Sequence, residues 1–315
     1  MSHQVTTHQV KMFSANVYHL AQQSGSRLFK YVRQEQQKGK VDFFDSYGSV
    51  EMREKTSRHS DIEYSDTPHS RRKVTTKYYY HADLVDNDDK LKMLHDPTSQ
   101  YAIAAKKAAG RKMDQTIIAG ALNSAWIGEE GTTETILPTT QKLCAHDGTT
   151  TSAVKMNLTT LKAIKAKFWG NEAIEDDENE EIILVLDSNN LIGLLDDEEI
   201  VNGDYNTVKA LVKGDIDTFM GFRFVRTQLV PVTATTTAFN PATGALEAST
   251  GTAAIGSRRC VAFLKNAVLY SSFGGIGAKV TELPAKHYSK QVYTHLECGS
   301  TRMEEVGVVE VICKA

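Results

Sequence analysis

The sequence predicts an α+β protein, because its helical and strand-like stretches do not alternate as they would in a doubly wound parallel sheet. Three observations carry this prediction: a long helical stretch at 96–126, a short apolar run at 182–186, and strand-like runs within 290–315. The residues Ile-Ile-Leu-Val-Leu at 182–186 form a continuous apolar run that is typical of a strand buried on both faces.

The stretch 96–126 predicts one long helix. Asp96 can cap its N-terminus, and Pro97 occupies the first helical position, where its missing N–H is no loss. About thirty residues at ~1.5 Å each would span roughly 45 Å, which is longer than the average helix of a globular domain. Two glycines, Gly110 and Gly120, are small enough to let another backbone approach.

The second half of this helix carries the candidate core residues. Ile118, Leu122 and Trp126 fall near one face at helical spacing, so we expect them to be buried. The first half is rich in alanine and carries basic residues expected nearer solvent or a subunit boundary: Lys106, Lys107, Arg111 and Lys112.

Composition excludes several classes of protein. The formal net charge of −3 over 315 residues argues against a general basic coat for nucleic acid. No run of about twenty apolar residues is present to span a membrane, and the first residues lack the apolar core of a signal peptide. Four widely spaced cysteines without a CxxC pair are expected to be reduced and at least half-buried: Cys144, Cys260, Cys298 and Cys313.

Residues 51–84 contain little hydrophobic mass and predict a long two-stranded excursion with a polar tip. Strand-forming residues gather on the second limb, from Val74 to Tyr80, and the polar centre contains Pro68. Because an isolated hairpin is marginally stable in water, this segment is either mobile or covered by a neighbouring subunit. The segment 13–37 is likewise too thin to be a domain, so it predicts an arm that packs on something else.

The sequence predicts no catalytic constellation, metal site or cofactor site. His59 and His69 flank the polar centre of the excursion, with Asp61 and Asp66 between them, but without the paired spacing of zinc ligands. The sequence contains no GxSxG, HExxH or GxxxxGK[ST] motif. A soluble metal-dependent enzyme that uses this His/Asp-rich hairpin remains an alternative.

Several motifs in order resemble one family, the major capsid proteins of tailed phages. The landmarks are DTPHSRR at 66–72, DPTS at 96–99 and GRKMDQTIIAGA at 110–121. The resemblance continues through 189–231 and closes with GSTRMEEVGVVEVICKA at 299–315. It covers nearly the whole chain and implies the Hong Kong 97-like capsid fold.

That fold implies a division of the chain into an arm, an extended loop, a peripheral domain and an axial domain. The expected limits are 1–47 for the N-terminal arm, 48–84 for the extended two-stranded loop, 85–152 for the peripheral domain with its spine helix at 96–126, 153–289 for the axial domain, and 290–315 for the strands that return to the peripheral domain. The arm and the loop would then have their partners on other subunits.

The resemblance implies a major capsid protein that assembles as pentamers and hexamers into an icosahedral head around double-stranded DNA. It implies a location in the virion shell after folding in the host bacterial cytoplasm, without contact to a membrane. A separate scaffolding protein, a portal and a decoration protein are expected partners. An encapsulin-like nanocompartment shell is the alternative within the same fold. Lys162, Lys165 and the lysines of the hairpin could be imagined in a covalent cross-link between subunits, but no partner asparagine or catalytic glutamate is specified, so no cross-link is predicted.

Two sets of charged residues complete the predictions. Five basic residues along the extended loop are expected at contacts between subunits, where they would meet carboxylates of a neighbour: Arg53, Arg58, Arg71, Arg72 and Lys73. Acidic runs at 175–181 and 196–199 favour a shell interior that is neutral to acidic and has no sequence-specific DNA site. Facing outward and lining the capsomer axis are the alternative placements of these runs.

Overall fold

The computed structural model describes most of the chain in nine segments. These are residues 23–48, 50–55, 57–58, 61–62, 64–85, 98–174, 181–195, 218–246 and 251–315. The chain divides into two compact units. The smaller unit comprises Lys77–Met113, Phe273–Glu297 and the described end of Met1–Ser26, and the larger unit comprises Arg27–Thr76, Asp114–Ser272 and Cys298–Ala315.

The long helix α2 spans Thr98–Leu122 and is shorter than the sequence predicts. The expected cap, Asp96, and Pro97 lie outside the described residues. At the other end the backbone turns through Asn123 and Ser124 into strand β5, Ala125–Ile127. The last carbonyls of a helix have no partner within it, and here the Arg302 guanidinium donates to the Ala121 carbonyl at 2.8 Å and to the Asn123 carbonyl at 2.5 Å.

The placement of Trp126 in the helix core is therefore wrong. Trp126 lies in β5, four residues beyond the end of α2, and its side chain is 44% exposed. Ile118 and Leu122, in contrast, lie within α2 and are buried, together with Ile117 and Ala121. The core face at this end of the helix is thus set by its last two turns.

The core of the larger unit is a mixed six-stranded sheet with the order β7-β16-β13-β8-β10-β9. The strands are β7 Lys142–Cys144, β16 Val308–Cys313, β13 Arg258–Phe263, β8 Ile182–Leu186, β10 Phe222–Arg226 and β9 Thr218–Phe219. Every residue of β8 is buried, which confirms the prediction of a doubly covered strand at 182–186.

Two helices belong to the same unit. Helix α3, Leu158–Gly170, begins after Asn157, whose side chain accepts from the Thr160 N–H at 2.9 Å as an N-cap. Helix α4 spans Ser188–Leu195. Short elements complete the unit: β11 Thr237–Phe239, β12 Gly251–Ala253, and the 3₁₀ turns η1 Phe29–Tyr31, η2 Thr139–Gln141 and η3 Lys265–Ala267.

A second sheet of the larger unit supports the extended loop. Its order is β2-β3-β5-β6, with β2 at Val41–Tyr47, β3 at His69–Thr75 and β6 at Thr133–Thr135. Strands β2 and β3 are antiparallel, with Val41 opposite Thr75 and Tyr47 opposite His69. In the same unit β1, Arg33–Gln36, runs parallel to the start of β14, Val268–Leu283.

The smaller unit combines the first part of α2 with a twisted ribbon of strands. Strand β15, Ser289–Arg302, lies between β14 and β4, Lys77–Val85, and the turn η4, Pro284–Lys286, joins β14 to β15. Tyr78 stacks on His295 and Tyr80 stacks on Tyr293. Tyr78 to Tyr80 thus belong to this ribbon, although the sequence places them on the second limb of the excursion.

All four cysteines are free thiols and buried. This confirms the prediction of reduced, buried cysteines. For Cys144, burial raises the pKa of the thiol to about 12, so this group stays protonated and unreactive at neutral pH.

We predict that Ile118→Ala or Leu122→Ala lowers the free energy of unfolding by about 2–5 kcal/mol, because each change leaves a cavity in a packed core. Chemical denaturation followed by circular dichroism measures this. Ile103→Ala is the matched control, since Ile103 lies on the same helix but is exposed. Equal stability of the Ile118 and Ile103 variants would contradict the assigned core face.

Candidate assembly interface

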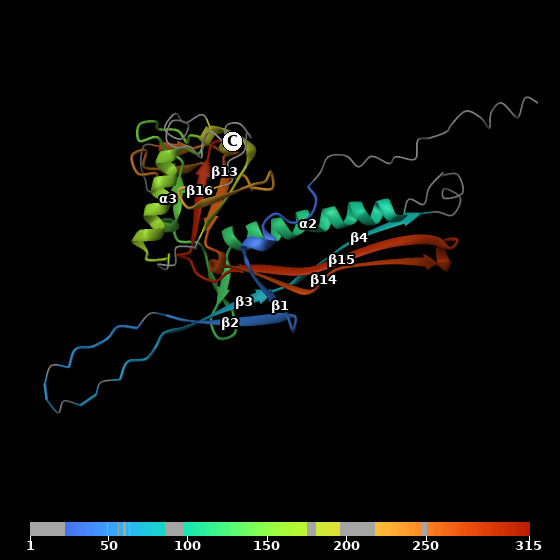
Figure 1. Cartoon of the computed structure of the whole chain (residues 1–315), viewed down its shortest axis with the longest axis horizontal. Coiled ribbons are helices and arrows are strands. Elements are labelled where there is room, and N and C mark those ends of the chain that lie inside the picture. The colour runs from blue at the N-terminus through green and yellow to red at the C-terminus, as the bar shows by residue number, and fades with distance from the viewer. Residues whose placement is uncertain are drawn as a thin grey trace, which may run out of the picture. The chain divides into compact units, whose positions relative to one another are not determined.

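Residues 48–68, here named the tip loop, connect β2 to β3 and contain the most exposed apolar side chains of the larger unit. In Figure 1 the two limbs of this loop run on from β2 and β3 as an open trace. The Gly48 N–H donates to the Pro68 carbonyl at 2.8 Å and closes the loop at its base. Every described residue from 50 to 68 is exposed, including Met52, Ile62 and, at 90%, Tyr64. Exposed apolar groups of this size within one segment are typical of an interaction site.

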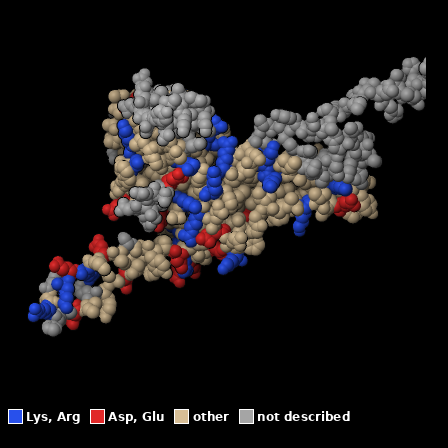
Figure 2. Space-filling model, viewed as in Figure 1, with Lys and Arg blue, Asp and Glu red and all other residues tan. Residues whose placement is uncertain are grey.

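Charges of both signs accompany these apolar groups. Figure 2 shows basic and acidic side chains gathered at the end of the loop. Arg53 and Arg58 are exposed there, and the acidic residues Glu51, Glu54 and Asp61 share the same segment. The tip loop therefore offers both apolar contacts and ion-pair partners, and its charged residues are of both signs.

At the base of the loop Arg71 is paired within the chain. Its Nε and Nη2 donate to the two carboxylate oxygens of Asp45 at 2.6 and 3.1 Å, across the β2–β3 pair. The hydrogen bond from Arg71 lowers the pKa of Asp45. This pairing is therefore complete at neutral pH and is lost only as the pH falls through the lowered pKa of Asp45. Lys73, two residues on, donates to the Gly131 carbonyl at 3.4 Å.

Arg72 points to the opposite face of β3 and is only 6% exposed. Its Nε donates to the Met303 carbonyl at 3.0 Å, and its Nη2 donates to Glu305 Oε2 at 2.6 Å. The second guanidinium beside Glu305 belongs to Arg302, whose Nε lies 3.9 Å from Glu305 Oε1. We call Arg72, Arg302 and Glu305 the arginine cluster.

The arginine cluster joins three parts of the larger unit at one buried point. Arg302 is completely buried, and besides the end of α2 it donates to the Thr135 carbonyl in β6 at 3.2 Å. Burial lowers the pKa of Arg302, yet a guanidinium remains charged at any physiological pH. Because Arg72 reaches the same glutamate from β3, the base of the tip loop is fixed beside the end of the helix.

The five residues predicted to contact a neighbouring subunit fall into two groups in the structure. Arg71 and Arg72 already have carboxylate partners inside the chain, and Lys73 contacts the β5–β6 turn. Arg53 and Arg58 lie on the tip loop, the part of the set best placed to reach a second copy. The sequence analysis did not identify Asp45 and Glu305 as the carboxylate partners of Arg71 and Arg72. Strand alternation could have shown that these two arginines lie on opposite faces and therefore have different partners. Contact with a neighbouring subunit stays a prediction for the set.

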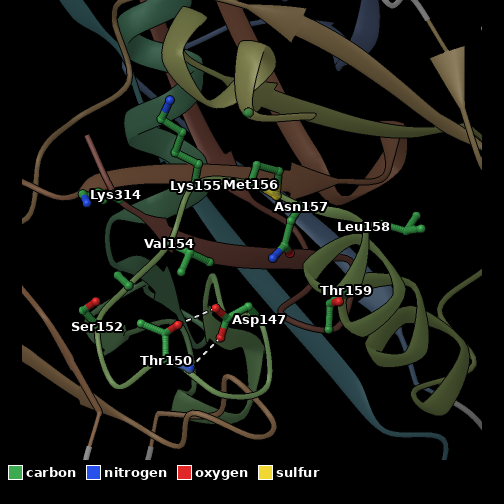
Figure 3. A pocket seen from close by; sticks show the side chains of 12 residues that line it. Asp147, Thr150, Ser152, Val154, Lys155, Met156, Asn157, Leu158, Thr159 and Lys314 are labelled. Carbon is green, nitrogen blue, oxygen red and sulfur yellow. Dashed lines mark hydrogen bonds between the residues drawn. The ribbon is translucent and has the colours of Figure 1, made fainter. Parts of the chain in front are cut away.

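A cavity of about 630 Å³ in the larger unit lies beside the start of α3 (Figure 3). Its acidic residue, Asp147, accepts from the backbone N–H groups of Thr149 and Thr150 at 2.9 and 2.6 Å, and also from the Thr150 hydroxyl. These bonds lower the pKa of Asp147. The carboxylate is thus ionised and occupied by its own loop, and the lining includes no histidine or cysteine to serve as a base or nucleophile.

The described ranges contain no group of three or more His, Cys, Asp or Glu side chains arranged for a metal ion. His69 packs edge-on against Tyr47 with ring centroids 4.8 Å apart, and His59 lies outside the described residues. Among the helices described, none is long and apolar enough to cross a membrane.

Comparison with known proteins identifies the family. The family model described as phage capsid protein matches residues 5–315, so the chain belongs to this family. No curated protein matches the sequence.

Solved structures show the same fold. The capsid structure of the cyanophage P-SCSP1u aligns with a TM-score of 0.70 at 15% identity, over 98% of this chain and 94% of that chain. The acidic stable capsid structure of Helicobacter pylori bacteriophage KHP30 aligns with a TM-score of 0.69 at 10% identity, over 99% and 98%. A chain of Mycobacterium phage Ogopogo aligns with a TM-score of 0.65 at 16% identity, over 99% of both chains.

Family and fold together define a structural protein of the Hong Kong 97-like capsid class. Its function is that of the major capsid protein of a tailed phage, and its place is the shell of the virion. The long helix, the loop of 48–68 and the buried sheet are thus parts of a shell subunit.

We predict that Glu305→Gln destabilises the chain by about 3 kcal/mol, because it leaves Arg72 buried opposite a neutral amide. Glu304→Gln is the matched control, since Glu304 is the adjacent residue and is exposed. Thermal unfolding of both variants measures the effect. If the two midpoints coincided, Glu305 would not hold the arginine cluster together.

Proposed function

We propose that this chain assembles as pentamers and hexamers into an icosahedral head that encloses double-stranded DNA. The exposed tip loop is the observation that carries the proposal, since it presents Met52, Ile62 and Tyr64 to solvent in the single chain. A closed shell requires each subunit to meet several neighbours through different edges. A loop whose apolar side chains are all exposed in the single chain is suited to such a contact between subunits.

The energetics favour this use of the loop. Covering an exposed side chain such as Ile62 or Met52 contributes about 1.5–3 kcal/mol, and the same contact is repeated by every copy in a shell. The base of the loop is held by the Arg71–Asp45 pair and by the arginine cluster. A loop whose base is fixed loses less freedom on docking, so more of the contact energy remains for assembly.

We assign the ion pairs a supporting role. Arg53 and Arg58 on the tip loop would meet carboxylates of a neighbouring subunit. Exposed pairs of this kind contribute ~0–1 kcal/mol each, and a bidentate arginine adds geometric selectivity. Arg71, Arg72 and Lys73 would act mainly by orienting the loop from their contacts within the chain.

The division of the chain into capsid domains is part of the proposal. Residues 1–47 would form the arm, 48–84 the extended loop, 85–152 and 290–315 the peripheral domain, and 153–289 the axial domain. The hairpin of β2 and β3 favours an extended loop in this part of the chain, with Val41–Tyr47 and His69–Thr75 as its paired limbs.

The remaining proposed partners are the other proteins that a phage head uses. A separate scaffolding protein would guide assembly, a portal would occupy one vertex, and a decoration protein would cover the exterior. The chain would fold in the host bacterial cytoplasm and carry out no catalysis. The DNA would be enclosed without sequence-specific binding.

We predict that Met52→Asp combined with Tyr64→Asp abolishes shell formation and leaves the chain folded, because both side chains are exposed in the single chain and would be buried between subunits. Sedimentation velocity and negative-stain microscopy measure the shells, and circular dichroism measures the fold. Lys55→Ala, an exposed change in the same loop, is the control. Normal shells from the double variant would exclude the tip loop as the assembly contact.

We also predict weak binding of isolated capsomers to double-stranded DNA at low salt. A head must release its genome, and repeated phosphate contacts by Lys or Arg would hold it in a salt-dependent way. The acidic runs that motivate this lie largely outside the described residues; within them, Glu181 pairs with Arg223 at 2.5 Å. Fluorescence anisotropy with labelled random-sequence DNA tests the point. Tight binding that weakens steeply with salt would defeat it, and purified shells that contain protein cargo in place of DNA would favour a nanocompartment.

A further inference from the structure

The start of the described chain crosses helix α2 at a place shaped to receive it. Gly25 has a φ of +80°, a conformation that favours glycine. Gly110 of α2 lies directly beneath it: a Cβ at Gly110 would stand 2.5 Å from the Gly25 carbonyl carbon. Gly110 is therefore needed for this approach, even though glycine weakens the interior of a helix.

One helical turn further on, Asp114 receives the next part of the same segment. Its two carboxylate oxygens each lie 3.1 Å from the Arg27 backbone nitrogen, and Oδ1 also accepts from the Leu28 N–H at 3.1 Å. Asp114 is completely buried. A buried carboxylate is tolerated only where hydrogen bonds compensate it, and aspartate is a poor residue for the interior of a helix. Its role here is to bind the backbone of the crossing segment.

The residues that follow this crossing, from Leu28 to the end of β1, pack within the larger unit. Leu28 is fully buried, Phe29 packs edge-on against Tyr270 at 5.5 Å, and β1 pairs with β14. The Arg27 guanidinium adds a hydrogen bond to the Arg226 carbonyl at 2.5 Å. The residues that precede Gly25 therefore start from a defined point on α2.

We infer that Asp114 and Gly110 are positioning residues for assembly: they fix residues 25–28 on α2 and so set the point from which residues 1–22, as part of the arm of the proposed function, would reach a neighbour. This inference rests on the proposed function, in which that segment is an arm. A tethered arm reaches its partner site at an effective concentration set by where the tether begins. If the starting point were free, the arm would search a larger volume, and the interaction between subunits would weaken without any change in the contact itself.

The test uses four chains beside the wild type. Asp114→Asn replaces one of the two acceptor oxygens by an N–H₂ group. This group opposes the Arg27 N–H if it takes the place of Oδ2, and both the Arg27 and the Leu28 N–H if it takes the place of Oδ1. Gly110→Ala strengthens the isolated helix but excludes the Gly25 backbone, so the two variants disturb the crossing by independent means. Lys106→Ala, an exposed change one turn earlier, is the control, and a chain without residues 1–22 shows what the arm contributes.

Two readouts separate positioning from mere stability: the critical concentration for shell formation and the rate of tryptic cleavage after Arg27 in the unassembled chain. We expect Asp114→Asn and Gly110→Ala to raise the critical concentration roughly tenfold, towards the value of the truncated chain, and to speed cleavage after Arg27. Lys106→Ala should change neither. If Asp114→Asn does not fold, Gly110→Ala provides the same comparison.

The outcomes distinguish the inference from the function on which it rests. Wild-type assembly with unchanged critical concentrations in both variants would overturn the inference and leave the proposed function intact. The same holds if removal of residues 1–22 leaves assembly unchanged. A wild-type chain that forms no shells would instead contradict the proposed function, and unchanged cleavage after Arg27 would then overturn the inference as well.

Discussion

The completely buried Arg302 guanidinium is the contact on which the larger unit depends most. A buried charge is costly unless its donors are paired. Arg302 donates from Nη1 and Nη2 to carbonyls at the end of α2 and in β6, while its Nε has no hydrogen-bond partner among the described residues. Glu305 then links it to Arg72 in β3. One side chain near the C-terminus thereby ends the long helix and holds the base of the tip loop. Residues distant in sequence must come together before this charge is satisfied, which makes the folding of this region cooperative.

The sequence predicted the local elements well where the signal was local. The strand at 182–186 and the buried face of Ile118 and Leu122 follow from apolar spacing alone. The end of α2 did not, because it is set by Arg302, 180 residues away in the chain, and no nearby breaker marks it. Trp126 continued the helical spacing, so pattern reasoning carried the helix four residues too far.

The two-stranded excursion was predicted in outline, and the structure corrects its strand pairing and its ion pairs. Low hydrophobic content identified the excursion, but it could not show that β4 belongs to the ribbon with β14 and β15. Equally, a row of basic residues could not reveal that Arg71 and Arg72 serve different faces with partners in the same chain. Pairing between distant strands decides both points, and the family resemblance supplied the overall arrangement that single-residue reasoning lacked.

The composition of the tip loop has a consequence for the subunit before it joins a shell. A capsid chain is made in many copies, and each carries Met52, Ile62 and Tyr64 exposed on an open segment. Segments prone to aggregation are windows of five to seven residues that combine β-propensity, hydrophobicity and low charge. Charged residues interrupt this segment throughout, so that no such window exists between 48 and 68. The same apolar side chains can therefore bind a subunit surface of matching shape, while the charged residues between them oppose aggregation of the free chain during synthesis.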